Sequence, residues 1–443
     1  MKRILFTIVL ATGFVLGAVP AHAALQIQSW ALENGARVLF VENHTIPMLD
    51  VSVEFDAGAR RDPAGLAGLA AFTNGMLARG VLAVADEPAL SEAQVSDAFA
   101  DTAARRGGVA GSDRAGVSLR TLSSPAERDA ALALLARMLA QPSFPDDIIG
   151  RDKARAIASL KEDLTKPEAI ADKAFSKALY GDHPYGPQAS VDSVAAISRD
   201  NVLEFHRSHY VADQAVIAMI GDISRAEADA IARQLTQRLP QGAAALPALP
   251  PVPPAHAEEL RIAHPASQAH ILIGAPALQR SDPDYFTLTV GNYVLGGGGF
   301  VSRLTREVRE KRGLSYSIYS YFSPMAQPGP FQIGLQTSKA QADDALKVVR
   351  STLADFLRDG PSQAELKAAK DNLVGGFALR IDNNRKILDN IAAIGYYRLP
   401  LDYLDTWTAK VAQVTTADIR AAFARKVALD KLVTVVVGVE QKK

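Results

Sequence analysis

Short stretches in which hydrophobic and polar positions alternate, or in which apolar β-branched residues run together, predict β-strands in both halves of the chain. Most of them are bounded by glycine, proline, asparagine or aspartate, which favour turns. The predicted strands are Ala36–Glu42, Met48–Phe55, Ala115–Leu122, Ala215–Ile220, Glu259–Ile262, His270–Ala275 and Leu432–Val437.

Longer stretches carry apolar residues at helical spacing and predict amphipathic helices between these strands. The predicted helices are Gly65–Ala78, Ala126–Ala140, Pro145–Leu164, Glu168–Tyr180, Ser198–Phe205, Tyr285–Leu295 and Thr415–Phe423. A hydroxyl residue followed by Glu three positions later indicates a capped helix start. This pattern occurs at Thr165, Ser224 and Ser362. Strand hairpins with clustered helices, rather than strict alternation, predict an α+β fold.

Residues 239–256 contain six prolines among small residues, which favours an extended connector. This linker separates an N-terminal domain, 24–238, from a C-terminal domain, 257–443. Both parts end with a helix, then a strand, then a glycine, and Gly75–Gly80 falls opposite Tyr293–Gly298. We interpret the two parts as an internal duplication.

The N-terminus, 1–23, has Lys2 and Arg3, an apolar run and a small-x-small ending at Ala23, the pattern of a cleaved secretory signal peptide. An uncleaved membrane anchor is the alternative, although the run is short for a bilayer span. No later segment is long and apolar enough to span a membrane. We therefore expect export, to the periplasm where the cell has an outer membrane.

The composition narrows the possible functions of the chain. Its 443 residues include 48 Lys+Arg and 48 Asp+Glu, so the net charge is zero, and no basic field indicates a nucleic-acid binder. It has no cysteine, which excludes disulfides, thiolate metal sites and cysteine nucleophiles.

Residues Gly68–Gly80 follow the frame Gly-Leu-Ala-x-Phe-x-x-x-Met-Leu-x-x-Gly. This frame resembles the active-site helix of the insulinase/pitrilysin zinc peptidases, whose signature is H-x-x-E-H. The positions of the two His and the Glu hold Ala71, Asn74 and Gly75 here. A methyl group, a neutral amide and a hydrogen cannot bind zinc, and an amide is no general base. We expect no metal in this chain.

The resemblance covers nearly all of the chain after residue 23. It aligns Asp152 with the third zinc ligand, a Glu in the family, although the register can shift by one residue. One carboxylate without two partners is a poor zinc site, and a solvated helix charge is the simpler interpretation. The turn His183–Gly186 also matches the family.

The second half carries the strongest match, at Leu295–Leu304 and Val308–Tyr316. Family members hold the substrate here with an Arg and a Tyr, which correspond to Arg309 and Tyr316. The resemblance implies that Arg309 ends a helix stopped by Gly313. It also implies that Tyr316, on a strand Leu314–Phe322, donates to the oxygen that becomes negative during attack. The alternatives are a surface charge for Arg309 and a Tyr316 packed beside Leu314 and Ile318.

Four glycines, Gly296, Gly297, Gly298 and Gly299, precede this pair. They lack the Gly-Lys-Ser/Thr ending of a phosphate-binding loop, so we expect a flexible loop that lets backbone approach a bound peptide. A simple turn is the alternative. His206 and His209 have helical spacing but no further ligand, and we expect them to be structural.

The resemblance implies two duplicated insulinase-like domains and the zinc-free subunit of an exported, heterodimeric metallopeptidase. A homologous partner with H-x-x-E-H is then expected to supply zinc, water and general base. Peptides are the expected substrates. A catalytically inactive peptide-binding or scaffolding protein is the main alternative, and an independent peptidase with a displaced metal site is a weaker one.

Overall fold

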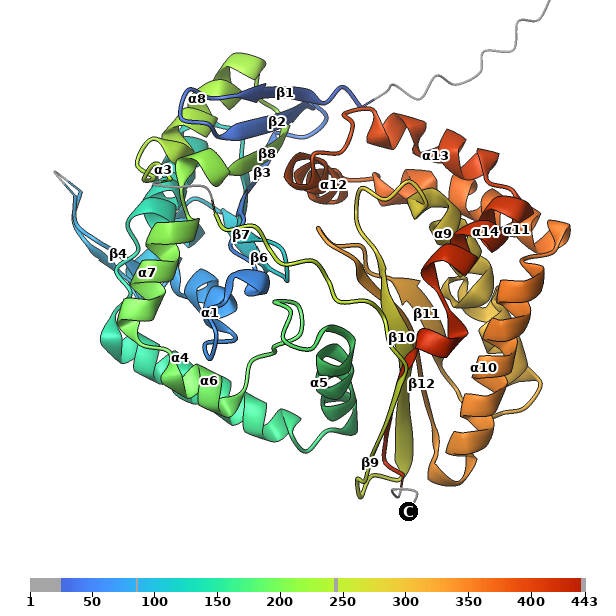
Figure 1. The fold of residues 1–443 in the computed structure, drawn as a ribbon. Coiled ribbons are helices and arrows are strands. Elements are labelled where there is room, and N and C mark those ends of the chain that lie inside the picture. The colour runs from blue at the N-terminus through green and yellow to red at the C-terminus, as the bar shows by residue number, and fades with distance from the viewer. Residues whose placement is uncertain (1–24, 85–86, 243–245, 440–443) are drawn as a thin grey trace, which may run out of the picture.

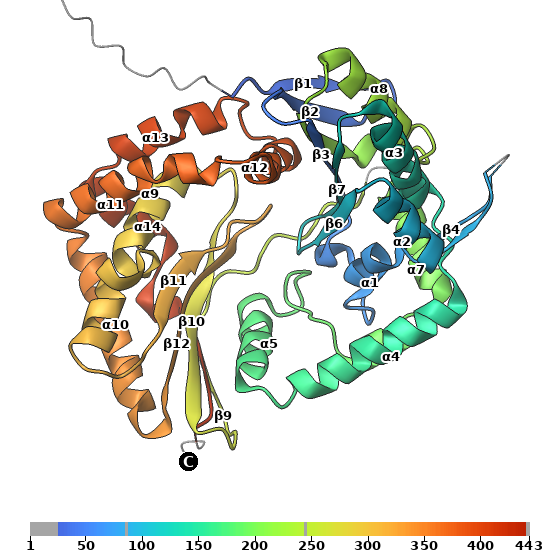
Figure 2. The ribbon, with the colours of Figure 1, turned by 180° about the vertical axis from the view of Figure 1, so that it is seen from behind.

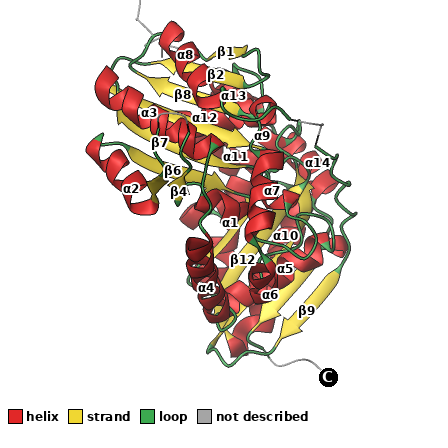
Figure 3. Cartoon of the chain, turned by 90° about the vertical axis from the view of Figure 1, so that its left-hand side faces the viewer, coloured by secondary structure: helices red, strands yellow, loops and turns green. Residues whose placement is uncertain are grey.

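The computed structural model describes residues 25–84, 87–242 and 246–439. Two β-sheets form the centres of two halves, and helices cover them (Figure 1). Viewed from the side, β1, β2, β8, β7 and β6 lie in the upper part of the molecule, and β12 and β9 lie in the lower part (Figure 3). The predicted signal peptide lies outside the described residues. In the part of the chain that the structure describes, no helix is long and apolar enough to cross a membrane.

The first sheet has six strands, and β2 and β8 form its parallel pair. Its other pairs are antiparallel. The central strand β3 is buried along nearly its whole length, because both of its faces are covered. In sheet order the strands are β1 (Gln28–Ala31), β2 (Arg37–Glu42), β8 (Val216–Gly221), β3 (Met48–Phe55), β7 (Ala115–Leu122) and β6 (Arg105–Ala110).

The second sheet has five strands and repeats the topology of the first. Its parallel pair, β9 and β13, corresponds to β2 and β8, and its central β10 corresponds to β3. The order is β9 (Glu258–Ile262), β13 (Val433–Val437), β10 (Gln268–Leu278), β12 (Gly329–Ser338) and β11 (Ile318–Phe322). This agreement confirms the predicted duplication and the mainly antiparallel α+β fold.

The helices follow the same duplicated order. Those of the first half are α1 (Leu69–Met76), α2 (Glu92–Asp101), α3 (Pro125–Ala140), α4 (Asp146–Asp163), α5 (Pro167–Tyr180), α6 (Val191–Ala196), α7 (Arg199–His209) and α8 (Arg225–Thr236). Those of the second half are α9 (Tyr285–Asn292), α10 (Ala342–Asp359), α11 (Gln363–Gly375), α12 (Asn384–Tyr397), α13 (Tyr403–Gln413) and α14 (Thr416–Lys426). A small hairpin, β4 (Gly80–Val81) with β5 (Leu90–Ser91), projects from the first half.

The two halves exchange one helix each. Helix α5 packs on β10 and β13 of the second sheet, and α12 packs on the first sheet (Figure 1 and Figure 2). Phe175 and Leu179 of α5 share one apolar cluster with Val435, whereas Ile391 of α12 shares another with Ile220. Each half therefore depends on the other to bury one face of its sheet.

A buried aspartate joins the two halves at their seam. Asp113, in the β6–β7 turn, accepts hydrogen bonds from Arg60 at 3.0 Å and from the Tyr185 hydroxyl at 2.5 Å. From the second half, the hydroxyl of Tyr397 and the N–H of Ala326 donate to its other oxygen, both at 2.8 Å. A buried carboxylate with this many partners fixes the orientation of one half against the other.

Several predicted helix boundaries are wrong, among them the ends of α7 and α14, which run on to His209 and Lys426. Helix α1 begins at Leu69 rather than Gly65, because Gly68 is left-handed, with φ +102°, and Asp62 accepts the N–H groups of Gly68 and Ala70. Thr165 does not cap α5, because Lys166 is the N-cap residue and the helix begins at Pro167. The capping boxes at Ser224 and Ser362 are confirmed.

Another wrong boundary is the end of the predicted helix Tyr285–Leu295. Helix α9 ends at Asn292 and continues as a π-helical turn, η3 (Tyr293–Gly297). Glycine has a low helix propensity, and the four-glycine run begins at Gly296, so the regular helix does not continue through it.

Candidate functional site

The three positions of the H-x-x-E-H signature lie on α1, in the first half of the molecule. Ala71 and Gly75 are exposed, and a Cβ built at Gly75 meets nothing within 4 Å. Larger side chains have room at Gly75, but this chain places no donor atom at either position. Helix α1 is therefore formed, but its exposed face carries no side chain that could bind a metal ion.

The side chain of Asn74 forms two hydrogen bonds within the first half of the molecule. Its side-chain amide donates to the carbonyl of Val109 on β6 at 3.2 Å and accepts from the Tyr210 hydroxyl at 3.0 Å. Tyr210 is fully buried, and burial raises the pKa of its phenol. The amide of Asn74 thus ties α1 to β6 and to the end of α7.

Asp152 lies beside the end of α1, at the place where the resemblance puts the third ligand. Its carboxylate pairs with Arg79 at 2.9 Å and with Arg151 at 2.9 Å. Only 12% of its side chain is exposed, so the expectation of a solvated helix charge is wrong. Because guanidinium groups already occupy both carboxylate oxygens, Asp152 is not poised to bind a cation.

The side chains around α1 do not fit a zinc ion. Ala71, Asn74 and Gly75 supply no imidazole, thiolate or carboxylate, and Asp152 is paired with arginines. Throughout residues 25–84, 87–242 and 246–439, no group of three or more His, Cys, Asp or Glu side chains is placed to hold a metal.

Arg309 lies in the last turn of the π-helical segment η5 (Thr305–Glu310), as expected from the sequence. Gly313 follows in the left-handed region, with φ +60°, and its N–H donates to the Arg309 carbonyl at 2.9 Å. The guanidinium lies 4.7 Å from the centre of the Phe300 ring. Within the described residues no carboxylate forms an ion pair with Arg309, so its donors are available to a ligand.

Tyr316 is 88% exposed. The alternative in which it packs beside Leu314 and Ile318 is therefore wrong. The predicted strand is too long at its start, because β11 begins at Ile318. The hydroxyl of Ser315 lies 2.6 Å from the Gln336 carbonyl and pins an irregular segment from which Tyr316 projects into solvent.

The glycine run combines close packing with one open position. A Cβ at Gly296 would lie 2.4 Å from the Ser320 hydroxyl, one at Gly297 2.6 Å from the Asn292 amide, and one at Gly298 2.6 Å from the Tyr293 carbonyl. A Cβ atom at any of these three positions would clash with a neighbouring residue, so only glycine fits there. Gly299 has φ +61° and open space beside it. Contact of the run with a substrate stays a prediction.

The sequence interpretation overlooked two apolar residues directly after the glycines. Phe300 is 68% exposed and Val301 is 67% exposed, which is unusual for adjacent large apolar side chains. Phe300 lies against the half-buried Arg309, and the exposed Tyr316 stands two residues before β11. We call these four residues, Phe300, Val301, Arg309 and Tyr316, the second-half surface. The signal in the sequence was an apolar pair placed after four glycines, where no regular element buries it.

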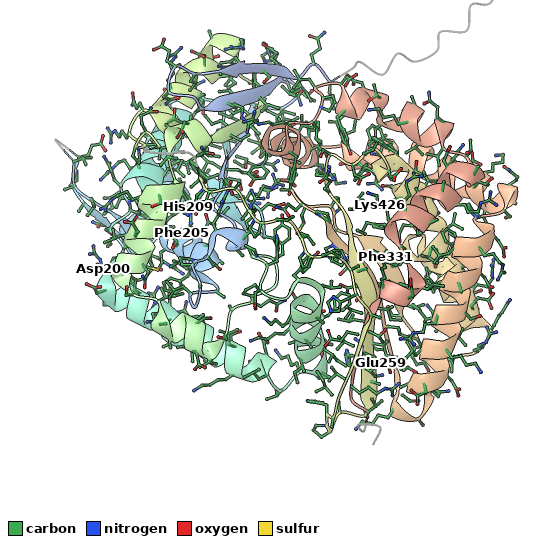
Figure 4. The ribbon with its side chains drawn as sticks, in the orientation of Figure 1. Asp200, Phe205, His209, Glu259, Phe331 and Lys426 are labelled. Atoms are coloured by element: carbon green, nitrogen blue, oxygen red, sulfur yellow. The ribbon has the colours of Figure 1, made fainter. Side chains whose placement is uncertain are left out.

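His206 and His209 are structural, as expected. His206 Nε2 lies 2.8 Å from the Leu139 carbonyl, and its ring stacks on Tyr210 with centroids 5.1 Å apart. Burial lowers its pKa to about 4. His209 Nδ1 lies 3.1 Å from the Asp56 carbonyl, and its ring contacts Phe205 on the same helix (Figure 4). These histidines support α7 and are not arranged as metal ligands.

The duplicated fold and the emptied helix define the class of this protein: an insulinase-like peptidase fold whose metal site lacks its ligands. The comparisons with known proteins agree. The family described as "Peptidase M16 inactive domain" matches residues 196–373. A crystal structure of a peptidase M16 inactive domain from Pseudomonas fluorescens is 37% identical. The match covers 95% of this chain and 99% of that one, with a TM-score of 0.88. The chain belongs to the M16 peptidase family.

Two relatives carry different descriptions. An uncharacterized zinc protease from Streptomyces coelicolor is 32% identical over 56% of this chain, and the match spans only 55% of that protein. A protein from Helicobacter pylori, described as a non-peptidase homolog, is 24% identical over 100% of both chains. The family thus includes members described as peptidases and members described as non-peptidases.

Proposed function

We propose that this chain is the zinc-free, substrate-gripping subunit of an exported, heterodimeric M16 metallopeptidase that degrades peptides. A homologous partner with an intact H-x-x-E-H helix supplies the zinc ion, the attacking water and the general base. Export is supported by the signal-peptide pattern at 1–23, which directs the chain to the periplasm of a cell with an outer membrane.

One observation carries the proposal: the chain retains exposed recognition groups while the helix that would do the chemistry has no donors. Tyr316 is 88% exposed, and Arg309 has no ion-pair partner in the described structure. A guanidinium fork suits a peptide carbonyl or carboxylate, and a phenol donates well to a developing oxyanion. Both residues flank β11 of the second half, whereas α1 lies in the first half (Figure 1). They are thus suited to serve a metal site that another subunit brings.

The experiment is a reconstitution. The full chain is isolated from its native cell with whatever copurifies, and the sample is tested for an H-x-x-E-H subunit of similar length. Each subunit alone and the two mixed are then assayed on short, unstructured peptides. We expect hydrolysis only in the mixture, and its loss on chelation of zinc. Hydrolysis of equal rate by the partner alone would contradict the proposal.

The second candidate is a non-enzymatic peptide-binding or scaffolding protein of the same fold. The Helicobacter pylori relative, described as a non-peptidase homolog along its whole length, favours it. The same reconstitution separates the two functions. Peptide binding by the pure chain, without an H-x-x-E-H partner in the copurified sample, supports the second candidate.

A further inference from the structure

A cavity of about 280 Å³ lies at the seam between the two halves. It is lined by the start of β2, the end of β3, the end of α12 and the segment after β10, so both halves build it. We call it the seam cavity. Its lining holds four arginines, Arg37, Arg60, Arg280 and Arg398, and one carboxylate, Asp56.

The carboxylate of Asp56 is already paired with two arginines. Asp56 accepts from Arg60 at 3.0 Å and from Arg61 at 2.6 Å. In the described residues neither Arg37 nor Arg398 has an ion-pair partner, and the Arg37 guanidinium donates to a neutral carbonyl, that of Gly395, at 2.7 Å. The seam cavity therefore holds an excess of positive charge that the described chain does not neutralise.

Among the residues that the structure describes, no carboxylate forms an ion pair with Arg280, and two tyrosines contact its guanidinium instead. Its guanidinium lies 4.9 Å from the ring centre of Tyr285 and 5.7 Å from that of Tyr403, and it donates to the Tyr285 hydroxyl at 3.2 Å. Its Nε is buried and has no hydrogen-bond partner in the structure. Because this atom has no accessible surface, a ligand in the seam cavity cannot reach it, and Arg280 contributes its positive charge beside the cavity.

Like charges gathered in one place also disfavour one another. Burial, and after it the charge of Arg398, lower the pKa of Arg37. Arg398 ends α12 in the left-handed backbone region, with φ 53° and ψ 42°, which an arginine rarely adopts. This backbone closes the C-terminus of α12, where the N–H groups of Arg398 and Leu399 both donate to the Ile394 carbonyl, and it places a cation beside the other arginines.

We propose that the seam cavity binds a small oxyanion, either inorganic phosphate or the C-terminal carboxylate of a peptide. Planar guanidinium groups match the paired oxygens of both ligands and form short, charge-assisted hydrogen bonds with them. Arg37 and Arg398 supply the donors and Arg280 adds a positive charge beside them, while Arg60 remains engaged with Asp56 and Asp113. The site is independent of the proposed function, because its first test needs neither zinc nor a partner subunit.

The test is calorimetric titration of the full chain with inorganic phosphate in a chloride buffer of constant ionic strength. We expect saturable binding with one phosphate per chain, and a rise in melting temperature with phosphate concentration. Arg398→Asn, which tolerates the left-handed backbone, is expected to weaken binding about tenfold or more through the loss of one charge-assisted contact. The matched control Arg420→Gln, on the exposed face of α14, is expected to bind as the unchanged chain does.

A second arm identifies the source of the oxyanion. A short peptide with a free C-terminus and its amidated twin are each tested as competitors of phosphate. Competition by the free acid alone assigns the site to peptide carboxylates, whereas no competition by either peptide assigns it to phosphate. Absence of saturable binding by both phosphate and free-acid peptide, or equal affinity in Arg398→Asn, overturns the proposal.

Discussion

The helix α1 and the second-half surface follow equivalent central strands of the duplicated fold, yet their chemistry differs. On α1 the one polar side chain of the signature positions, Asn74, is used internally, bonded to Val109 and Tyr210. On the second-half surface Arg309 and Tyr316 remain available, next to the exposed ring of Phe300. The polar side chain of the first region is thus used within the chain, whereas Arg309 and Tyr316 of the second region are free to contact a ligand.

Both regions keep their relative positions only if the two halves stay together, and Asp113 joins the halves through buried hydrogen bonds. Its substitution is therefore expected to have the largest effect. We expect Asp113→Ala to lower the free energy of unfolding by about 3–5 kcal/mol, because it leaves two tyrosine hydroxyls without a buried acceptor and removes one of the two carboxylates that pair with Arg60. Urea unfolding measures this loss. Asp129→Ala, which breaks a pair whose Asp129 side chain is 60% exposed, is the control and is expected to cost less than about 1 kcal/mol.

The second prediction concerns the side chains of Arg309 and Tyr316. In the mixed complex, Tyr316→Phe is expected to lower kcat/KM about a hundredfold, because it removes one donor to the oxyanion. Arg309→Ala is expected to act in the same direction, mainly through KM, because it removes a contact to the substrate main chain. Assembly and melting temperature are expected to stay unchanged, since both side chains contact little of this chain. Unchanged turnover in both variants would remove them from the mechanism.

The third prediction is a pH dependence in the scaffold behind α1. The pKa of His206 is about 4 in the folded chain and about 6.5 in the unfolded chain, so the unfolded state binds more protons between these values. Stability therefore falls as pH falls through this window, by about 2 kcal/mol from this residue between pH 7 and pH 5. Unfolding titrations at both pH values measure it. A His206→Gln variant should lose this part of the slope, and an identical slope would contradict the assignment.

The smallest effect is expected at the emptied signature itself. Asn74→Ala leaves the buried Tyr210 hydroxyl without its acceptor and should cost roughly 1–2 kcal/mol of stability. Gly75→Ala, where a Cβ meets open space, should not destabilise the chain. If Asn74→Ala instead abolished activity of the mixed complex without changing stability, α1 would have a direct role and the comparison would fail.

Most strands inside the two sheets were predictable because apolar periodicity reports burial directly, although the interior strand β12 was missed. The edge strands β9 and β11 of the second sheet were predicted, whereas β1 and β6 of the first sheet were not. Strand β6 reads Arg-Arg-Gly-Gly-Val-Ala and is mostly exposed, so it lacks the apolar pattern of a core strand. The helix exchange was hidden for a different reason. The apolar face of α5 shows that it is buried, but nothing in that face identifies the second sheet as its partner.

Part of the site was also predictable. The frame around α1 and the spacing of Arg309 and Tyr316 are local patterns, and the structure places these residues on the expected elements or close to them. The pairing of Asp152 with Arg79 and the convergence of Arg37, Arg280 and Arg398 depend on residues far apart in the chain. Such long-range contacts leave no periodic signal in one sequence.

The most direct test of the central claim is the metal content of the purified full chain, measured together with its peptidase activity. The protein is dialysed against zinc, separated from free metal, and assayed alone and after mixing with the H-x-x-E-H subunit. The account predicts far less than one zinc per chain and hydrolysis only in the mixture. One tightly held zinc per chain, with peptide hydrolysis by the chain alone, would contradict it.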